Sequence, residues 1–298
     1  MKIIIVGDYC TDIKVMGSVD RLNPEAPVPI LDSQISAVNF AKNMTNFGSR
    51  GMAGNVYENM LNILPALYES DILTVYTPPQ DVDVRLLSYD GYKDHPVKLR
   101  FLDEKSGYIL LRVDFPFSGV LPRFKRGEFL RHFEQHGVEC VVISDYDKGY
   151  LSVQDINWIS SLCKTYRVPC MIDTKKPVLD LDDNFTYIKI NNDEYHNSFT
   201  NIDKTPYNMF NLIVTRGAKG AELVNTGIKS IADDISVRDV CGAGDAFLAA
   251  LVVLTIASDI GIRETLYLCN QISGEVCKSH NSSITMEAAE KIFNKYAS

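Results

Sequence analysis

The second half of the chain alternates short apolar runs with longer amphipathic segments, the pattern of a parallel sheet covered by helices. A first apolar run at residues 3–6 is rich in isoleucine and predicts a central strand buried on both faces. Each run ends in polar residues, so ligands are expected at the carboxyl edge of the sheet. Further strands are expected at residues 140–143, 169–172, 187–190 and 212–214, with a helix at about 152–166.

A second pattern, the strict alternation of apolar and polar residues, occurs at residues 97–102 and 109–114 and predicts a β-hairpin. Residues 24–29 contain three prolines, a density that excludes helix and favours a rigid surface loop or lid. One more strand is expected at residues 72–75, and an amphipathic helix from about residue 286 onward.

Composition narrows the class of protein. The chain has 298 residues, of which 46% are hydrophobic and 23% charged, as in an ordinary soluble globular protein. Its net charge of −8, without a basic stripe, argues against nucleic acid as a partner and favours small molecules. The seven cysteines form no CxxC pair and predict reduced thiols in a cytoplasmic protein. The first apolar run is too short to cross a membrane.

Residues 239–247 (DVCGAGDAF) carry the strongest chemical signal. Two glycines flank an alanine, an acid follows, and an apolar run at residues 248–257 continues at once as a helix. Gly242, Ala243 and Gly244 can therefore offer backbone N–H groups to an anion at a helix N-terminus. Asp245 can accept the proton of an attacking hydroxyl group. The alternative is a glycine-rich turn in which Asp245 caps the helix.

The whole string DVCGAGDAFLAAL resembles the C-terminal signature of the PfkB, or ribokinase-like, sugar kinases. This resemblance implies that Asp245 is the catalytic base and that Gly242 to Gly244 form the anion hole. It also implies ATP and Mg²⁺ as cofactors. Cys241 stands where most members of the family have threonine.

The N-terminal region is similar to bacterial heptose-7-phosphate kinases, which act in lipopolysaccharide precursor synthesis. The similarity rests on Gly7, Asp8, Asp12, Gly17 and Arg21 followed by the run PEAPVP. It implies that Asp12 binds sugar hydroxyl groups and that the proline-rich strand belongs to a β-lid over the substrate. A capping or solvated loop role for Asp12 is the alternative.

Other segments extend the resemblance along the chain. Asn55 is expected to present its amide to the substrate or to cap a helix, and Met52 follows Gly51 where the family has a second glycine. The motifs SDYDKG, IDTK, NNDE and TRGAKG match family motifs at strand ends, although each residue alone also suits a turn or cap. The substrate-binding residues implied in this way are Asp8, Asp12, Arg21, Gly51, Asn55, Lys98, Arg100, Asp145 and Lys148. The cofactor residues implied are Lys175, Asn191, Thr215, Gly217, Gly220 and Asn270 for ATP, with Asn191 and Glu194 organising Mg²⁺ through water.

Together these features predict a single ribokinase-like domain over residues 1–298. We expect a three-layer α/β/α core with a mostly parallel sheet, and a β-lid built from about residues 9–32 and 84–115. The predicted reaction is transfer of the γ-phosphoryl group of ATP to a sugar hydroxyl group, with D-glycero-D-manno-heptose 7-phosphate as the expected acceptor and its 1,7-bisphosphate as product.

Several alternatives stay open. Another sugar or sugar-phosphate kinase of the same family is one. A non-catalytic sugar- or nucleotide-binding protein is another, because Met52, a short segment after Asn59 and the loop at His280 depart from the family pattern. A monovalent cation and a homodimer formed through the lid are further possibilities. No HxGH motif occurs, so a kinase without a nucleotidyltransferase domain is expected.

Overall fold

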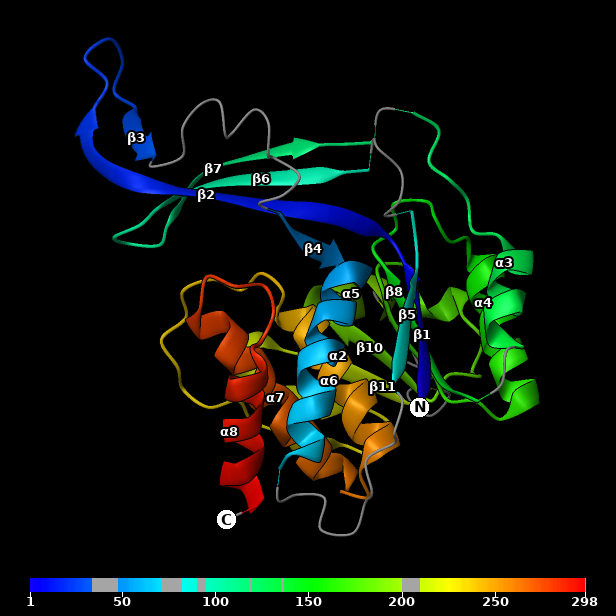
Figure 1. The fold of residues 1–298 in the computed structure, drawn as a ribbon. Coiled ribbons are helices and arrows are strands. Elements are labelled where there is room, and N and C mark those ends of the chain that lie inside the picture. Colours follow the sequence, from blue (N-terminus) through cyan, green and yellow to red (C-terminus); the bar gives the residue numbers. More distant parts are fainter. Residues whose placement is uncertain are drawn as a thin grey trace.

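The computed structural model describes residues 1–33, 48–70, 82–89, 95–117, 119–134, 137–199 and 210–297. Its main sheet has eight strands in the order β13-β12-β11-β10-β9-β8-β1-β5 (Figure 1). All neighbours from β5 to β11 pair in parallel, and β12 and β13 add an antiparallel edge. The strands are β1 (Lys2–Gly7), β5 (Asp83–Leu87), β8 (Val138–Asp145), β9 (Cys170–Thr174), β10 (Tyr187–Asn191), β11 (Leu212–Thr215), β12 (Ala221–Leu223) and β13 (Ile228–Ser230).

Helices cover both faces of this sheet, as the continuous apolar run of β1 predicted. Ile3 and Ile5 of β1 belong to one hydrophobic core, and the alternate residues Ile4 and Val6 belong to the other. The first core includes α2 (Ala53–Tyr68), α6 (Ala243–Ala257), α7 (Ile262–Lys278) and α8 (Met286–Ala297). The second includes α3 (Arg126–Phe133), α4 (Val153–Tyr166) and α5 (Asn192–Phe199). Two 3₁₀ turns, η1 (Val178–Asp180) and η2 (Gly217–Lys219), follow β9 and β11.

A separate five-stranded sheet forms the lid above the carboxyl end of the core (Figure 1). Its long strand β2 pairs with β3, β4 and β6, and β6 pairs with β7. The lid strands are β2 (Tyr9–Leu22), β3 (Pro29–Ser33), β4 (Gly48–Met52), β6 (Val97–Asp103) and β7 (Ile109–Phe115). The chain passes from β1 into β2 through Asp8 alone, so the lid is a direct continuation of the central strand.

The α/β fold with a β-lid is therefore confirmed, and the predicted helix at 152–166 is α4, whose Ser152 hydroxyl group accepts the Asp155 N–H at 3.1 Å. One boundary differs. The second lid segment was expected from residue 84, but β5 pairs with β1 in the main sheet because Val84 is apolar and buried there. The strand expected at 72–75 lies outside the described residues. Within the described part of the chain, every helix is too short or too polar to cross a membrane.

Candidate active site

The start of α6 is left without a side-chain cap. The Ala243 N–H donates to the Val240 carbonyl at 3.3 Å, so Gly242 and Gly244 are the residues whose N–H groups can face a ligand. Gly242 holds this turn in the left-handed region, with φ of 84°. A Cβ atom at Gly242 would lie 2.0 Å from the Ser282 carbonyl oxygen, so no other residue fits without moving the backbone. Asp245 does not cap the helix, and the capping interpretation is wrong for this residue.

Asp245 instead accepts two hydrogen bonds from distant parts of the chain. Asn55 Nδ2 donates to its Oδ2 at 2.9 Å, and the Tyr146 hydroxyl group donates to its Oδ1 at 2.7 Å. Burial raises the pKa of Asp245 to about 6, although these two hydrogen bonds lower it. A carboxylate held in this way is mostly ionised at neutral pH and can accept a proton.

Asn55 is itself fixed in orientation. Its Nδ2 also donates to the Ser282 carbonyl at 2.8 Å, and its Oδ1 accepts from Asn59 Nδ2 at 3.2 Å. Asn59 in turn accepts the Ile284 N–H at 3.0 Å. The amide that the sequence assigned to the substrate thus orients Asp245 and joins α2 to the loop at residues 279–284.

Two cavities meet at Gly244. One, of about 470 Å³, lies between the η2 loop, α6 and α7, and its lining includes Thr215, Gly217, Gly220 and Asn270. The other, of about 410 Å³, is lined by charged residues from the ends of β9 and β10. Thr215, Gly217 and Gly244 line both cavities. The structure therefore brings the residues predicted to bind ATP together beside the start of α6.

A buried ion pair that the sequence analysis missed lies at this junction. Lys189 Nζ is 2.5 Å from Asp173 Oδ2, and a Cβ atom at Gly244 would lie 3.1 Å from the same ammonium group. Burial lowers the pKa of Lys189, but Asp173 raises it further, so the lysine stays charged. A lysine inside the apolar strand 187–190 was the available signal, because lysine is rarely buried without a partner.

Asn191 and Glu194 form a reciprocal cap at the start of α5. Glu194 Oε2 accepts the Asn191 N–H at 2.7 Å, and Asn191 Oδ1 accepts the Glu194 N–H at 2.9 Å. The other Glu194 oxygen pairs with Lys175. The described residues contain no cluster of three or more His, Cys, Asp or Glu suited to a metal. This single carboxylate fits an ion held through water molecules, and does not fit one enclosed by protein ligands.

The loop after β8 carries Tyr146 and is braced by two acids that the sequence assigned to the sugar. Asp8 Oδ2 accepts the N–H groups of Tyr146 at 2.8 Å and Lys148 at 3.1 Å. Asp145 pairs with Lys176 at 2.8 Å. Both acids are almost fully buried, whereas the Lys148 side chain is exposed. Asp8 and Asp145 thus position Tyr146, which the sequence analysis quoted within SDYDKG without assigning it a role.

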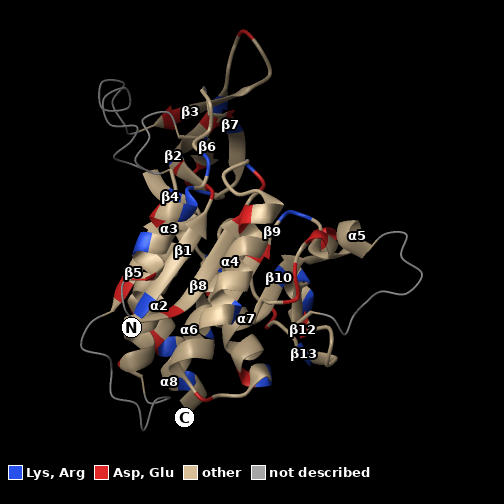
Figure 2. Cartoon of the chain, turned by 90° about the vertical axis from the view of Figure 1, so that its right-hand side faces the viewer, with Lys and Arg blue, Asp and Glu red and all other residues tan. Residues whose placement is uncertain are grey.

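The lid strands carry charged residues above this edge of the core (Figure 2). Asp12 pairs with Arg100 at 2.6 Å, and Gly51 leaves room for the Asp12 carboxylate, because a Cβ atom there would lie 2.4 Å from Oδ2. Lys98 lies 5.7 Å from the centre of the Tyr146 ring. Arg21, by contrast, is exposed and pairs with Asp32 within the lid.

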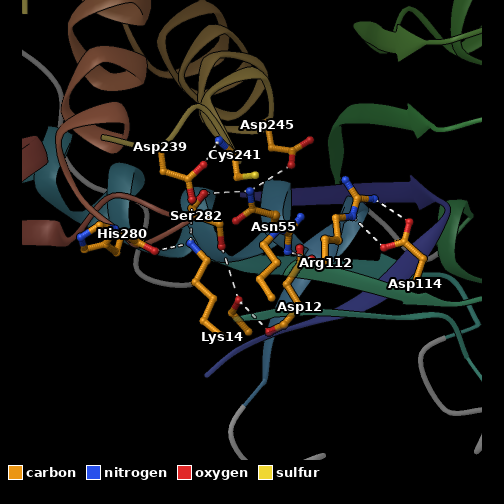
Figure 3. A network of polar contacts seen from close by, with 12 residues as sticks. Asp12, Lys14, Asn55, Arg112, Asp114, Asp239, Cys241, Asp245, His280 and Ser282 are labelled. Carbon is orange, nitrogen blue, oxygen red and sulfur yellow. Dashed lines mark hydrogen bonds and ion pairs between the residues drawn. The ribbon is translucent and has the colours of Figure 1, made fainter. Parts of the chain in front are cut away.

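Lys14 is a further lid residue that the sequence analysis did not single out. Its ammonium group lies 3.1 Å from Asp239 Oδ2 and donates to the His280 carbonyl oxygen (Figure 3). Asp239 is the residue that opens the DVCGAGD string, and His280 lies in the loop that holds Asn55.

Comparison with solved structures identifies the fold as ribokinase-like. Phosphofructokinase-2 from Escherichia coli in complex with substrates and products superposes with a TM-score of 0.63 and 15% identity, covering 100% of both chains. The same enzyme in complex with potassium gives 0.62 and 15%, covering 99% of this chain and 98% of the other. Ribokinase from Arabidopsis thaliana, complexed with ribose and ATP, gives 0.59 and 13% over 98% of both chains. At such identities the likeness establishes the fold alone.

The curated relatives in sequence are bifunctional HldE proteins. The one from Rhodopseudomonas palustris is 27% identical over 295 residues, which cover 88% of this chain and 58% of that protein. The one from Haemophilus influenzae (strain PittEE) is 26% identical over 302 residues, covering 92% and 60%. The chain thus spans less than two thirds of the length of these relatives. No protein-family model matches the sequence.

Proposed function

We propose that the chain is an ATP-dependent sugar kinase, which transfers the γ-phosphoryl group of ATP to a sugar hydroxyl group. The observation that carries this proposal is the position of Asp245, a nearly buried carboxylate at an uncapped helix start whose residues Ala243 and Gly244 line a large cavity. Phosphoryl transfer needs positioned charge more than covalent chemistry from the protein. The start of α6 supplies donors for the phosphoryl group and an acceptor for the proton.

The residues divide the reaction between them. The acceptor oxygen attacks the γ-phosphorus, the bond from that phosphorus to the ADP oxygen breaks, and Asp245 receives the hydroxyl proton. The N–H groups of Gly242 and Gly244 and the ammonium of Lys189 stabilise the negative charge of the transferred group. The Ala243 N–H, which the sequence analysis included, donates to the Val240 carbonyl. Asn55 and Tyr146 hold the Asp245 carboxylate toward the acceptor.

ATP fits the larger cavity, whose lining combines the apolar start of α6 with the η2 loop. Gly217 and Gly220 both have positive φ, of 57° and 82°. No described atom lies within 4 Å of a Cβ atom at Gly217, so the η2 backbone is open to a phosphate chain there, whereas Gly220 packs against the Ser230 carbonyl. Mg²⁺ neutralises phosphate charge when it is bound, and Glu194 with Asn191 would hold it through water.

A monovalent cation is a weaker candidate, although one phosphofructokinase-2 structure contains potassium. The oxygens of Asp239 and His280 beside the start of α6 already bind the Lys14 ammonium group. The proposal therefore does without this ion.

The lid favours a phosphorylated sugar as the acceptor. Lys14, Arg100 and Arg112 lie side by side on neighbouring strands β2, β6 and β7. In the adjacent row Lys98 lies between Asp12 and Asp114. Lys14 pairs with Asp239, Arg100 with Asp12 and Arg112 with Asp114, so Lys98 leaves this face with one cation in excess. Such an excess suits an anionic group on the substrate. With HldE proteins as relatives, we propose D-glycero-D-manno-heptose 7-phosphate, phosphorylated at its 1-hydroxyl group.

An assay of ADP release from ATP and Mg²⁺ tests both levels of the proposal. The panel compares heptose 7-phosphate with other sugar phosphates, free sugars and a nucleoside. ADP release that depends on one acceptor supports the kinase, and preference for the heptose phosphate supports the substrate. Far better turnover of a plain hexose would overturn the substrate. ATP binding without turnover of any acceptor would favour a non-catalytic binding protein.

The lid also supports a homodimer. Strand β7 lies at the edge of the described lid sheet, and its Ile109, Leu111 and Phe115 side chains are each 44% to 56% exposed. Exposed apolar residues on an edge strand favour pairing with a second strand. We propose that two lids pack together, which sedimentation of the wild type against a Leu111→Lys variant would test. A monomeric wild type would contradict it.

A further inference from the structure

Lys14 connects the lid to the core at the site itself. It lies on β2, and its side chain is 16% exposed. Figure 3 shows its ammonium group pointing at Asp239 and at the loop that carries His280. These two acceptors belong to different segments of the core, residues 239–242 and residues 279–284. The first segment contains Gly242, and the second packs against it.

The first segment reaches Gly242 through Asp239. One Asp239 oxygen binds Lys14, and the other accepts the Cys241 N–H at 2.9 Å. Burial raises the pKa of Asp239, but the Cys241 N–H and Lys14 lower it to below its usual value. The carboxylate is thus charged, almost buried, and bonded to the residue just before Gly242.

The second segment reaches Gly242 through the loop at residues 279–284. Lys14 binds the His280 carbonyl, and two residues later the Ser282 carbonyl lies against the Gly242 Cα and accepts from Asn55. The lid contacts this loop a second time at Gly107, where a Cβ atom would lie 2.3 Å from the His280 ring. Lys14 is therefore bonded to both segments that hold the start of α6 in shape.

A carboxylate and a backbone carbonyl are oxygen donors of the kind that hard metal cations take. Here a tethered ammonium group fills the position between them. A buried carboxylate needs a cation, because an unpaired buried charge is strongly destabilising. The protein supplies that cation from the lid.

We propose that Lys14 is a built-in cation that holds the 239–242 turn in its anion-binding shape, so that the site needs no monovalent metal ion and forms only with the lid strand in place. Lys14 is a positioning residue, since it acts on the reacting groups through Asp239 and Ser282. The expected effect on kcat rests on the proposed kinase function, whereas the expected effect of small cations on the Tm does not.

The experiment compares the wild type with Lys14→Ala and with Lys105→Ala. Lys105 is the matched control, because it is a lid lysine that pairs with a lid carboxylate, Asp20, at 68% exposure. Each protein is measured in potassium chloride, methylammonium chloride and tetramethylammonium chloride at equal ionic strength. The readouts are the Tm without substrates, and kcat and KM with ATP and an accepted sugar.

The wild type and Lys105→Ala are expected to give the same Tm and kcat in all three salts. Lys14→Ala is expected to lose about tenfold to a hundredfold in kcat in tetramethylammonium, as a small displacement of positioned groups does. Potassium and methylammonium can enter the space that the Lys14 side chain leaves. Each is therefore expected to raise the kcat of Lys14→Ala several-fold above its value in tetramethylammonium. The same two cations are expected to raise the Tm of Lys14→Ala alone.

Three results would overturn the inference. The first is that potassium raises the kcat or the Tm of the wild type. The second is that Lys14→Ala keeps the wild-type kcat in tetramethylammonium. The third is that neither potassium nor methylammonium restores the kcat that Lys14→Ala loses. If no acceptor gives turnover with the wild type, the kinase proposal fails on its own. The salt dependence of the Tm then still decides for or against the built-in cation.

Discussion

The start of α6 and the lid sheet both carry charged residues, but they hold them in different ways. At α6 the Asp245 carboxylate is 5% exposed and receives hydrogen bonds from α2 and from the loop after β8. In the lid, several ion pairs join neighbours of the same sheet and stay open to solvent. Arg112 with Asp114 and Arg21 with Asp32 have side chains that are 47% to 64% exposed.

This contrast fits the proposed division of labour, in which the start of α6 carries out the chemistry and the lid recognises the acceptor. Groups fixed before the reaction stabilise a transition state without reorganising, and this is the condition of Asp245 and the α6 amides. Exposed ion pairs contribute little to stability and exchange partners easily, which suits side chains that must meet a substrate. Changes at α6 should therefore reduce kcat, and changes at the exposed lid pairs should alter KM or nothing. Lys14 is the lid residue expected to affect kcat, because it binds Asp239 of the core.

The largest effect is expected for Asp245→Asn. The variant keeps the shape of the side chain but cannot accept a proton, so kcat should fall by about a hundredfold to ten-thousandfold. ADP release measured at saturating ATP and acceptor checks this. ATP binding should remain, because the cavity at the η2 loop is unchanged.

Asp183→Asn is the control, since it removes the same charge from an exposed position outside the site. Its kcat should equal that of the wild type. If Asp245→Asn retained wild-type turnover, the proposed base would be wrong, and the contrast between a chemical core and a recognising lid would lose its basis.

The second effect is expected for Gly242→Ala. A side chain at φ of 84° is strained and would collide with the Ser282 carbonyl. We expect a loss of about 1–3 kcal/mol in the free energy of unfolding and a fall of about a hundredfold in kcat, as for misplaced positioning groups. Gly127→Ala is the matched control, because nothing lies within 4 Å of its added Cβ. Equal Tm values for the two variants would show that the turn tolerates a side chain.

The same contrast explains how much the sequence alone could reveal. The core strands and the α6 motif are local patterns, in which adjacent residues fold together, and both were predicted close to their observed positions. Thr215, Gly217 and Gly220, which were predicted to bind ATP, also line one cavity together with Gly244 of the α6 motif. Local patterns carry this information because the element that presents each residue is the segment that contains it.

Long-range partners could not be predicted in this way. Nothing near Lys14 in the sequence indicates that it reaches Asp239, and the Tyr146 hydroxyl bond to Asp245 joins residues 99 apart. The partners of Asp8 and Asp145 could not be predicted for the same reason, since backbone N–H groups and Lys176 bind their carboxylates. These contacts depend on which strand ends become neighbours, and periodicity does not encode that.

A smaller effect is expected for Tyr146→Phe, and it concerns pH. Turnover needs ionised Asp245, so it should fall as the pH drops through about 6. The Tyr146 hydrogen bond lowers the pKa of Asp245, and its removal should therefore move this acid limb to higher pH. At a pH well above the limb, kcat should fall by only a few-fold.

A pH profile of kcat for both proteins checks the shift. Tyr166→Phe is the control, because its ring is 61% exposed at the end of α4. An acid limb that did not move, or that moved to lower pH, would contradict the assignment of Asp245 as the titrating base.

The smallest effect is expected for Arg21→Ala, at the far end of β2. The family resemblance assigned Arg21 to the substrate, whereas the structure pairs it with Asp32 at 3.3 Å in an exposed part of the lid. An exposed pair of this kind contributes about 0–1 kcal/mol to stability, so Tm, kcat and the acceptor KM should stay close to wild type. Arg100→Ala, which unpairs the half-buried Asp12, should raise the acceptor KM in the same assay. A KM raised equally by Arg21→Ala would mean that the end of the lid reaches an acceptor after all.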